Sequence, residues 1–180
     1  RNPYYSSLYK KNDCNLALSN YVAADINQRW KPERPASSIQ WGCDLPFYKH
    51  SKEVGDGIVI AGRTSRDFST VIQALNQSKT KGTILYLKGH LAHKGEVSEN
   101  ITLLESDNEQ PVPGKQQGWK KVKDLIPIYQ SSRAIGIPLY DQDSLAGLTS
   151  LMDCLGSGKP VIMTRNHNID LDIEKEKIEK

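Results

Sequence analysis

Two arginines that lie close together have the chemistry to bind an anion. Arg63 and Arg66 sit in the stretch GRTSRDF, directly after the apolar run from Ile58 to Ala61 and before a segment with helical spacing. Arginine binds phosphate oxygens through two parallel hydrogen bonds, and a helix N-terminus adds free N–H groups and partial positive charge. A surface ion pair between one or both of these arginines and Asp67 or another nearby acid explains the same residues equally well.

A second group of polar residues occurs in the stretch YDQDSLAGLTSLMDCLGSGKP. Gly147 allows a ligand to approach the main chain, and Thr149 or Ser150 can donate a hydroxyl to the same anion. Asp153 follows Thr149 by four residues, so both lie on one helix face. Such a carboxylate either faces solvent or accepts hydrogen bonds from ligand hydroxyls, and the two hydroxyls of a ribose suit it well.

Other reaction types find little support in the residue pattern. His90 and His93 lie in KGHLAHKG, where no third ligand is placed by spacing, so we expect exposed loop histidines rather than a metal pair. The sequence contains neither a nucleophile elbow nor a recognisable Ser-His-Asp or Cys-His arrangement, which disfavours a hydrolase.

Composition indicates a globular protein with a mild charge. The 180 residues are 37% hydrophobic and 25% charged, and the net charge of +3 is too small to indicate nucleic-acid binding. Three cysteines without a CxxC pair indicate a reducing compartment. No apolar run has the length of a transmembrane helix, and no apolar signal segment is present. These observations predict a cytoplasmic protein.

Apolar runs alternate with segments of helical spacing along the chain. Strands are predicted at residues 16–18, 58–60, 83–87, 101–104, 134–139 and 160–163, and helices at 21–30, 67–77, 119–130 and 145–155. The strands are continuous apolar runs, which is typical of a parallel sheet covered on both faces. The alternation predicts an α/β fold with a doubly wound, Rossmann-like parallel sheet and helices on both faces.

A polar, irregular segment, LPFYKHSKEVGDG, divides the chain. It predicts that residues 1–52 form the end of an N-terminal domain with its linker, and that residues 53–180 form the Rossmann-like domain. Because such a domain seldom stops soon after a strand, we expect it to be truncated at its C-terminus. Residues 105–118 are predicted to form a long polar loop.

Three stretches, taken together, resemble the family 4 retaining glycosyltransferases, which have two Rossmann-like domains in the GT-B architecture. AGLTSLMDCLGSGKPVIMT resembles the family's segment with two glutamates separated by seven residues. GRTSRDFSTVIQAL resembles its glycine-basic turn, and IQWGCDLPFYK resembles the stretch between its domains. The three occur in family order and cover most of residues 14–165.

The resemblance implies a role for each matching residue. Arg63 and Arg66 would bind the diphosphate of a nucleoside diphosphate sugar. The loop that meets the phosphates and sugar through its backbone would be formed by Gly147, Leu148 and Thr149.

The acids of the family motif match less completely. Asp153 stands at the second glutamate and would bind the ribose. The first glutamate falls at Leu145, which cannot contact a sugar as an acid does. Asp143, two residues away, and His90, at a predicted strand end, are the candidates for sugar contacts. No catalytic residue is implied.

The resemblance therefore implies the donor-binding half of a glycosyltransferase of hexosyltransferase type. It would transfer a sugar, with retention, to a glycan, lipid or lipid-linked glycan, without a metal or other cofactor. A preceding N-terminal domain would contribute the acceptor site and peripheral contact with the inner face of a membrane, so this chain would bind donor without efficient transfer. No nucleic-acid partner is expected. The alternative, favoured by Leu145, is a non-catalytic module that binds nucleotide sugars or serves as a scaffold.

Overall fold

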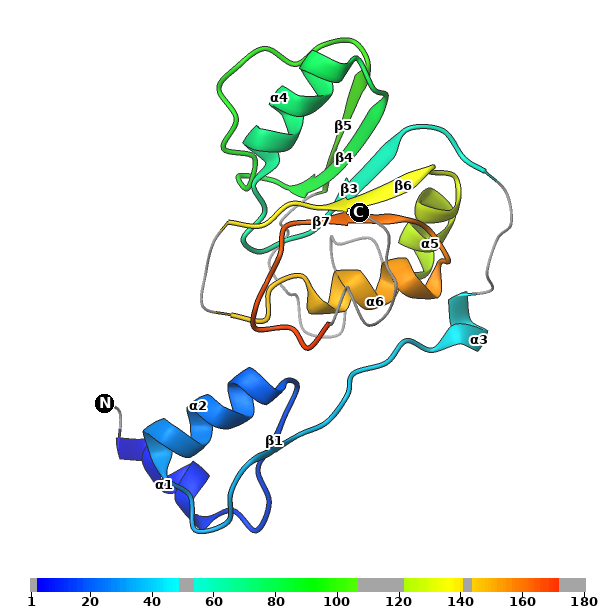
Figure 1. Ribbon diagram of the computed structural model, residues 1–180. Helices are drawn as coiled ribbons and strands as arrows, with labels where there is room; N and C mark the ends of the chain where they lie inside the picture. Colours follow the sequence, from blue (N-terminus) through cyan, green and yellow to red (C-terminus); the bar gives the residue numbers. More distant parts are fainter. Residues whose placement is uncertain (1–2, 49–53, 107–121, 141–143, 172–180) are drawn as a thin grey trace, which may run out of the picture. The chain divides into compact units, whose positions relative to one another are not determined.

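The computed structural model describes residues 3–48, 54–106, 122–140 and 144–171 (Figure 1). The chain falls into two compact units. Among the described residues, the first unit contains 3–42, 144–145 and 165–171, and the second contains the remainder. The chain first passes from one unit to the other at Cys43, ahead of the boundary predicted at residue 52. The assignment of the two parts to the two domains of a larger enzyme stays a prediction.

The first unit contains a small strand–helix–strand motif. Its elements are α1 (Pro3–Lys11), β1 (Leu16–Ala17), α2 (Asn20–Trp30) and β2 (Ser37–Ser38). The two strands pair in parallel, as expected when a helix connects them. The core of the unit consists of small and medium side chains: Ala17, Ala23, Ile26 and Ala36.

Two side chains cap the N-terminus of α2. Ser19 Oγ accepts a hydrogen bond from the amide of Val22 (3.2 Å), the usual role of a serine at the N-cap. Asp170 Oδ2 accepts from the amide of Asn20 (2.7 Å). A carboxylate is favourable there because the helix dipole is positive at this end.

The second unit is built on a five-stranded sheet. Its strands are β3 (Ile58–Ala61), β4 (Gly82–Leu87), β5 (Ile101–Ser106), β6 (Ala134–Ile137) and β7 (Val161–Met163). The spatial order is β5-β4-β3-β6-β7, and every neighbouring pair is parallel. The predicted α/β fold with a parallel sheet is confirmed, and its topology is compatible with a Rossmann-like fold.

The strand order reverses direction between β3 and β6. From β3 the chain adds β4 and β5 on one side, and it then returns to add β6 and β7 on the other. The connections therefore diverge at the carboxyl ends of β3 and β6. In open parallel sheets, ligands bind at this switch point.

Helices cover both faces of the sheet, as predicted. The helix α4 (Phe68–Ser78) covers one face, and α5 (Val122–Gln130) and α6 (Leu148–Gly156) cover the other (Figure 1). A short helix, α3 (Leu45–Tyr48), packs against α6. This helix lies in the segment that was predicted to be irregular, and α6 begins three residues later than predicted because Gly147 takes a left-handed conformation (φ 89°) as its N-cap.

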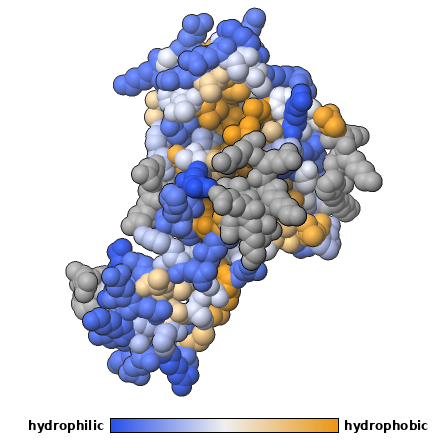
Figure 2. All heavy atoms as spheres, viewed as in Figure 1, coloured by the Kyte–Doolittle hydropathy of each residue, from blue (hydrophilic) through white to orange (hydrophobic). Residues whose placement is uncertain are grey.

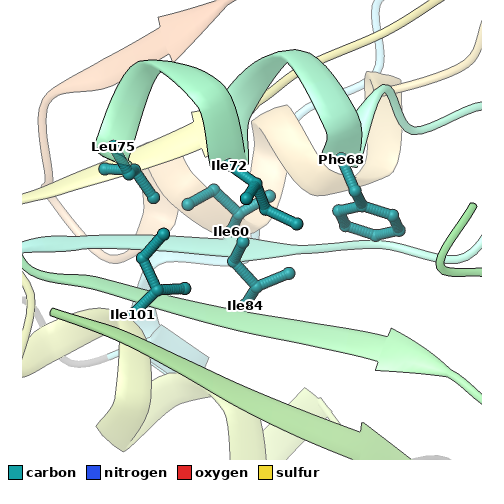
Figure 3. Packing of buried hydrophobic residues seen from close by; sticks show 6 residues of the cluster. All are labelled: Ile60, Phe68, Ile72, Leu75, Ile84 and Ile101. Atoms are coloured by element: carbon teal, nitrogen blue, oxygen red, sulfur yellow. The ribbon is translucent and has the colours of Figure 1, made fainter. Parts of the chain in front are cut away.

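The face under α4 has an apolar core. Ile60, Phe68, Ile72, Leu75, Ile84 and Ile101 form one buried cluster between the helix and the strands (Figure 3). Val71 is partly buried and packs against it. The helix therefore packs its apolar side on the sheet, and Asp67 caps its N-terminus by accepting from the amide of Thr70 (3.0 Å).

The surface visible in Figure 2 is mostly hydrophilic, with patches of apolar side chains. Within the described ranges, no helix combines the length and the apolar character needed to cross a membrane. Cys14, Cys43 and Cys154 are all free thiols.

Candidate functional site

The turn that carries the two arginines lies beside the segment that follows β6. Arg66 forms an isolated antiparallel bridge with Leu139, and the amide of Tyr140 donates to the carbonyl of Ser65 (3.2 Å). The arginine turn follows the carboxyl end of β3, and the chain leading to α6 follows the carboxyl end of β6. These two segments therefore lie side by side. The structure thus brings the two polar groups of the sequence to one edge of the sheet.

Arg66 is buried at this edge, with 7% of its surface exposed. Its Nη1 donates to the carbonyl of Thr64 (2.9 Å), and its Nη2 donates to Ser150 Oγ (2.7 Å). Its Nε has no hydrogen-bond partner among the described residues. The α-carbon of Gly62 lies against the guanidinium, and a Cβ there would overlap it.

No carboxylate neutralises Arg66 within the described part of the chain. Asp67, the ion-pair partner considered from the sequence, instead caps α4 through Thr70. Burial lowers the pKa of Arg66, because a charged group loses hydration there. A buried cation without a counter-charge is costly, so the exposed ion-pair explanation does not apply to Arg66.

The N-terminus of α6 faces the same guanidinium through Ser150. Its N-cap, Gly147, provides no side-chain cap, so the amides of the first turn lack the partner that a capping residue supplies. A Cβ at Gly147 would crowd Met163 (2.9 Å) and Leu139 (3.1 Å). The glycine is thus required by packing as well as by its backbone angle.

Two further predicted residues, Arg63 and His90, meet at the end of β4. Both are exposed. His90 Nδ1 donates to the carbonyl of Arg63 (2.8 Å), which places the β4 turn against the arginine turn. The structure thus brings the residue predicted to contact a sugar next to one predicted to contact a diphosphate.

Asp153 lies one turn further along α6 than Ser150. It is half-buried, and its Oδ1 accepts a hydrogen bond from the hydroxyl of Tyr48 in α3. Burial raises the pKa of Asp153, and the Tyr48 hydrogen bond opposes that rise. Sequence reasoning missed Tyr48, because nothing in LPFYK indicates that the tyrosine turns toward α6 rather than toward solvent.

The remaining predicted residues take different positions. Leu148 is buried (6% exposed), so only its backbone faces the helix N-terminus. Thr149 is exposed, and its neighbour Ser150 is the residue that contacts Arg66. Leu145 is partly buried. Asp143 lies outside the described residues.

A metal site finds no support in the part of the chain that the structure describes. No three His, Cys, Asp or Glu side chains there gather in a way that would hold an ion. His93, the second histidine of the candidate pair, contacts Ser69 Oγ through Nδ1 (3.1 Å) and lies 3.3 Å from the carbonyl of Glu96 through Nε2. These contacts of His93 link the loop after β4 to α4.

Neither the comparison with protein-family models nor the comparison with curated proteins found a match to this sequence. The resemblance to glycosyltransferases therefore rests on the three sequence motifs.

Proposed function

We propose that the second unit binds the diphosphate of a nucleoside diphosphate sugar, and that the chain is the donor-binding half of a retaining glycosyltransferase of GT-B architecture. The observation that carries this proposal is Arg66. A buried guanidinium that has no carboxylate partner among the described residues points at the uncapped first turn of α6, at the switch point of a parallel sheet. An anionic ligand would supply the missing negative charge.

A diphosphate fits this edge better than a single small anion. Arg66 and the amides of α6 supply positive potential at one point of the sheet edge. Arg63 and His90 form a second polar group further along the same edge, after β4. Two linked phosphates can contact both parts. Arginine binds such oxygens strongly because its planar group forms charge-assisted pairs.

The same residues suit the chemistry of glycosyl transfer. The leaving group of the donor is the nucleoside diphosphate, on which negative charge develops as the bond to the sugar breaks. Arg66 and the N-terminus of α6 would stabilise that charge from fixed positions. His90, beside Arg63, would lie near the sugar. The acceptor, a glycan or a lipid-linked glycan, would bind outside this unit.

Calorimetric titration of the chain with inorganic pyrophosphate, UDP, GDP and ADP tests the proposal. The wild-type chain should bind pyrophosphate and one of the nucleotides. Arg66→Met should weaken both about tenfold or more, the typical effect of removing a charged hydrogen-bond donor. Arg63→Met should weaken pyrophosphate more than it weakens the nucleoside.

Arg133 offers a matched control, because it is an exposed arginine at the amino end of β6, the opposite end of the strand from the site. Arg133→Met should leave every affinity unchanged. If none of the diphosphates bound to the wild-type chain, or if Arg133→Met and Arg66→Met weakened them equally, the proposal would fail.

A non-catalytic module that binds nucleotide sugars is the second candidate, and Leu145 favours it. Its side chain stands where the related motif has a sugar-binding acid. A module of this kind would bind the nucleotide and its sugar conjugate with equal affinity and would leave the conjugate intact. A glycosyltransferase would prefer the conjugate and slowly hydrolyse it, and Leu145→Glu should increase that preference.

A further inference from the structure

Tyr48 is held from several sides, although it belongs to the segment that leads out of the first unit. It is 7% exposed. Its ring lies on Gly156 of α6, where a Cβ would overlap it. Its carbonyl accepts from Gln130 Nε2 (3.0 Å), and its hydroxyl donates to Asp153 Oδ1. Both α5 and α6 therefore fix this one tyrosine.

The hydrogen bond occupies one side of the Asp153 carboxylate and leaves the other available. Among the residues that the structure describes, Oδ2 has no hydrogen-bond partner. A carboxylate accepts several hydrogen bonds through its two oxygens. Because Oδ1 is anchored, the side chain is restrained in rotamer, and binding at Oδ2 costs less side-chain entropy.

Ser150 and Asp153 are three residues apart on α6, so they occupy the same helix face. Ser150 contacts Arg66 at the proposed diphosphate, and Asp153 contacts Tyr48 one turn away. One helix turn advances about 5.4 Å along the helix axis. The two contacts are therefore near enough together for a diphosphate and the ribose linked to it to reach both.

We propose that Tyr48 is a positioning residue for ribose recognition: it holds Asp153 through Oδ1 so that Oδ2 accepts the ribose hydroxyls. This inference rests on the proposed function. It makes α3 part of the nucleotide site. The selectivity for a ribonucleotide would then depend on a single phenol in the connecting segment.

Tyr48 also supports the charge on Asp153. Burial raises the pKa of this carboxyl, whereas the Tyr48 hydrogen bond lowers it. The other titratable groups that interact with Asp153 are Tyr129 of α5 and the adjacent Cys154, and burial raises the pKa of both. These two groups are therefore neutral near pH 7, and the Tyr48 hydrogen bond is what lowers the pKa of Asp153 against the effect of burial.

The test compares a nucleoside diphosphate, its 2′,3′-dideoxy analogue and inorganic pyrophosphate, titrated into wild type and Tyr48→Phe. Phenylalanine keeps the ring on Gly156 and removes only the hydroxyl. Wild type should prefer the ribonucleotide about tenfold, the usual effect of one or two hydrogen bonds to a charged group. Tyr48→Phe should lose most of this preference and keep its affinity for pyrophosphate.

The pH dependence gives a second readout that a merely structural role would not move. Without the phenol, the pKa of Asp153 should rise further, so the carboxylate is protonated at a higher pH during acidification. Ribonucleotide binding by Tyr48→Phe should therefore fall at a higher pH than binding by wild type. Pyrophosphate binding should not show this difference.

Two further variants keep the test decisive. Asp153→Asn should lose the ribose preference in the same way, whether or not Tyr48→Phe is stable enough to titrate. Tyr9→Phe removes the hydroxyl of a tyrosine whose ring stacks on Trp30 in the first unit (ring centroids 5.6 Å apart). It should change neither the ribose preference nor the affinity for pyrophosphate.

The outcomes separate the two proposals. A preference for ribose that survives in Tyr48→Phe overturns the role of Tyr48. Equal binding of both nucleotides by wild type overturns it as well, while diphosphate binding stands. If neither nucleotide nor pyrophosphate binds to wild type, the proposed function fails, and the inference fails with it.

Discussion

The two faces of the five-stranded sheet are packed with different chemistry. On the α4 face, the buried cluster around Ile72 contains only hydrocarbon and aromatic side chains. On the α6 side, the buried or half-buried residues include a guanidinium, a carboxylate and phenols, in Arg66, Asp153, Tyr48 and Tyr129. One face is organised for stability, and the other accepts groups that are costly to bury.

This difference indicates where a ligand belongs. A protein that only needed to cover the second face would use apolar side chains, which pack there at lower cost. Arg66 instead brings a charge to the sheet edge, and its Nε has no partner among the residues that the structure describes. Buried polar groups without partners are uncommon in native proteins and call for an explanation. A bound anion is the explanation that we propose.

The largest effect is expected from truncation on the apolar face. Ile72 is fully buried (0% exposed), so Ile72→Ala should lower the free energy of unfolding by about 3 kcal/mol. Urea denaturation measures this loss. Val54 is 86% exposed, and Val54→Ala should cost less than about 0.5 kcal/mol. Equal losses for the two variants would show that the α4 cluster is not the stabilising core.

A smaller effect of opposite sign is expected on the polar side. Arg66→Met should raise the free energy of unfolding by about 1 kcal/mol, since it removes a buried charge that no carboxylate of the described residues compensates, and it keeps the side-chain volume. Arg133→Met, at the exposed end of β6, should be neutral. A loss of about 3 kcal/mol in Arg66→Met would mean that the arginine serves the fold, and the contrast between the faces would disappear.

The smallest effect on stability is expected from replacing two residues that have a left-handed backbone, one in the arginine turn and one after α4. Ser65 in the arginine turn (φ 58°) and Lys79 after α4 (φ 55°) are both left-handed. Glycine at either position relieves about 1–2 kcal/mol of steric cost but loses about 0.5–1 kcal/mol in chain entropy. Each variant should therefore gain about 0.5 kcal/mol in thermal or urea denaturation.

Ligand binding distinguishes these two glycine variants. Lys79→Gly should keep the affinity for pyrophosphate. Ser65→Gly should lower it severalfold, because the turn that carries Arg66 gains freedom. Identical affinities in both variants would show that the left-handed turn does not help to hold the anion.

The sequence predicted much of the fold because local patterns agree with the tertiary structure. The apolar runs that form β3, β4 and β6, and the helical spacing from Phe68 to Leu75, identified the parallel sheet and the α4 face. The short helix α3 was missed, because four residues with a proline give no periodicity. The start of α6 was predicted too early. Leu145 fits the helical spacing of the apolar residues, but Gly147 is the N-cap, so the helix begins only after it.

The candidate site was predicted in its residue types but not in its contacts. Glycine, arginine and acid at the ends of apolar runs indicated an anion site, and the structure places the segments that carry them beside each other at the edge shared by β3 and β6. The burial of Arg66 and the Tyr48–Asp153 contact were not predictable, because both depend on how segments distant in sequence pack. Asp153 and Tyr48 are 105 residues apart along the chain.

The cap that Asp170 places on α2 has a consequence for biosynthesis. The amide of Asn20 and this carboxylate are separated by 150 residues, and chains are synthesised at about 5–20 residues per second. The helix therefore waits about 8–30 s for its acidic cap after it is made. Every strand of the five-stranded sheet is synthesised in this interval, so α2 gains its acidic cap only after the strands of the other unit have been made.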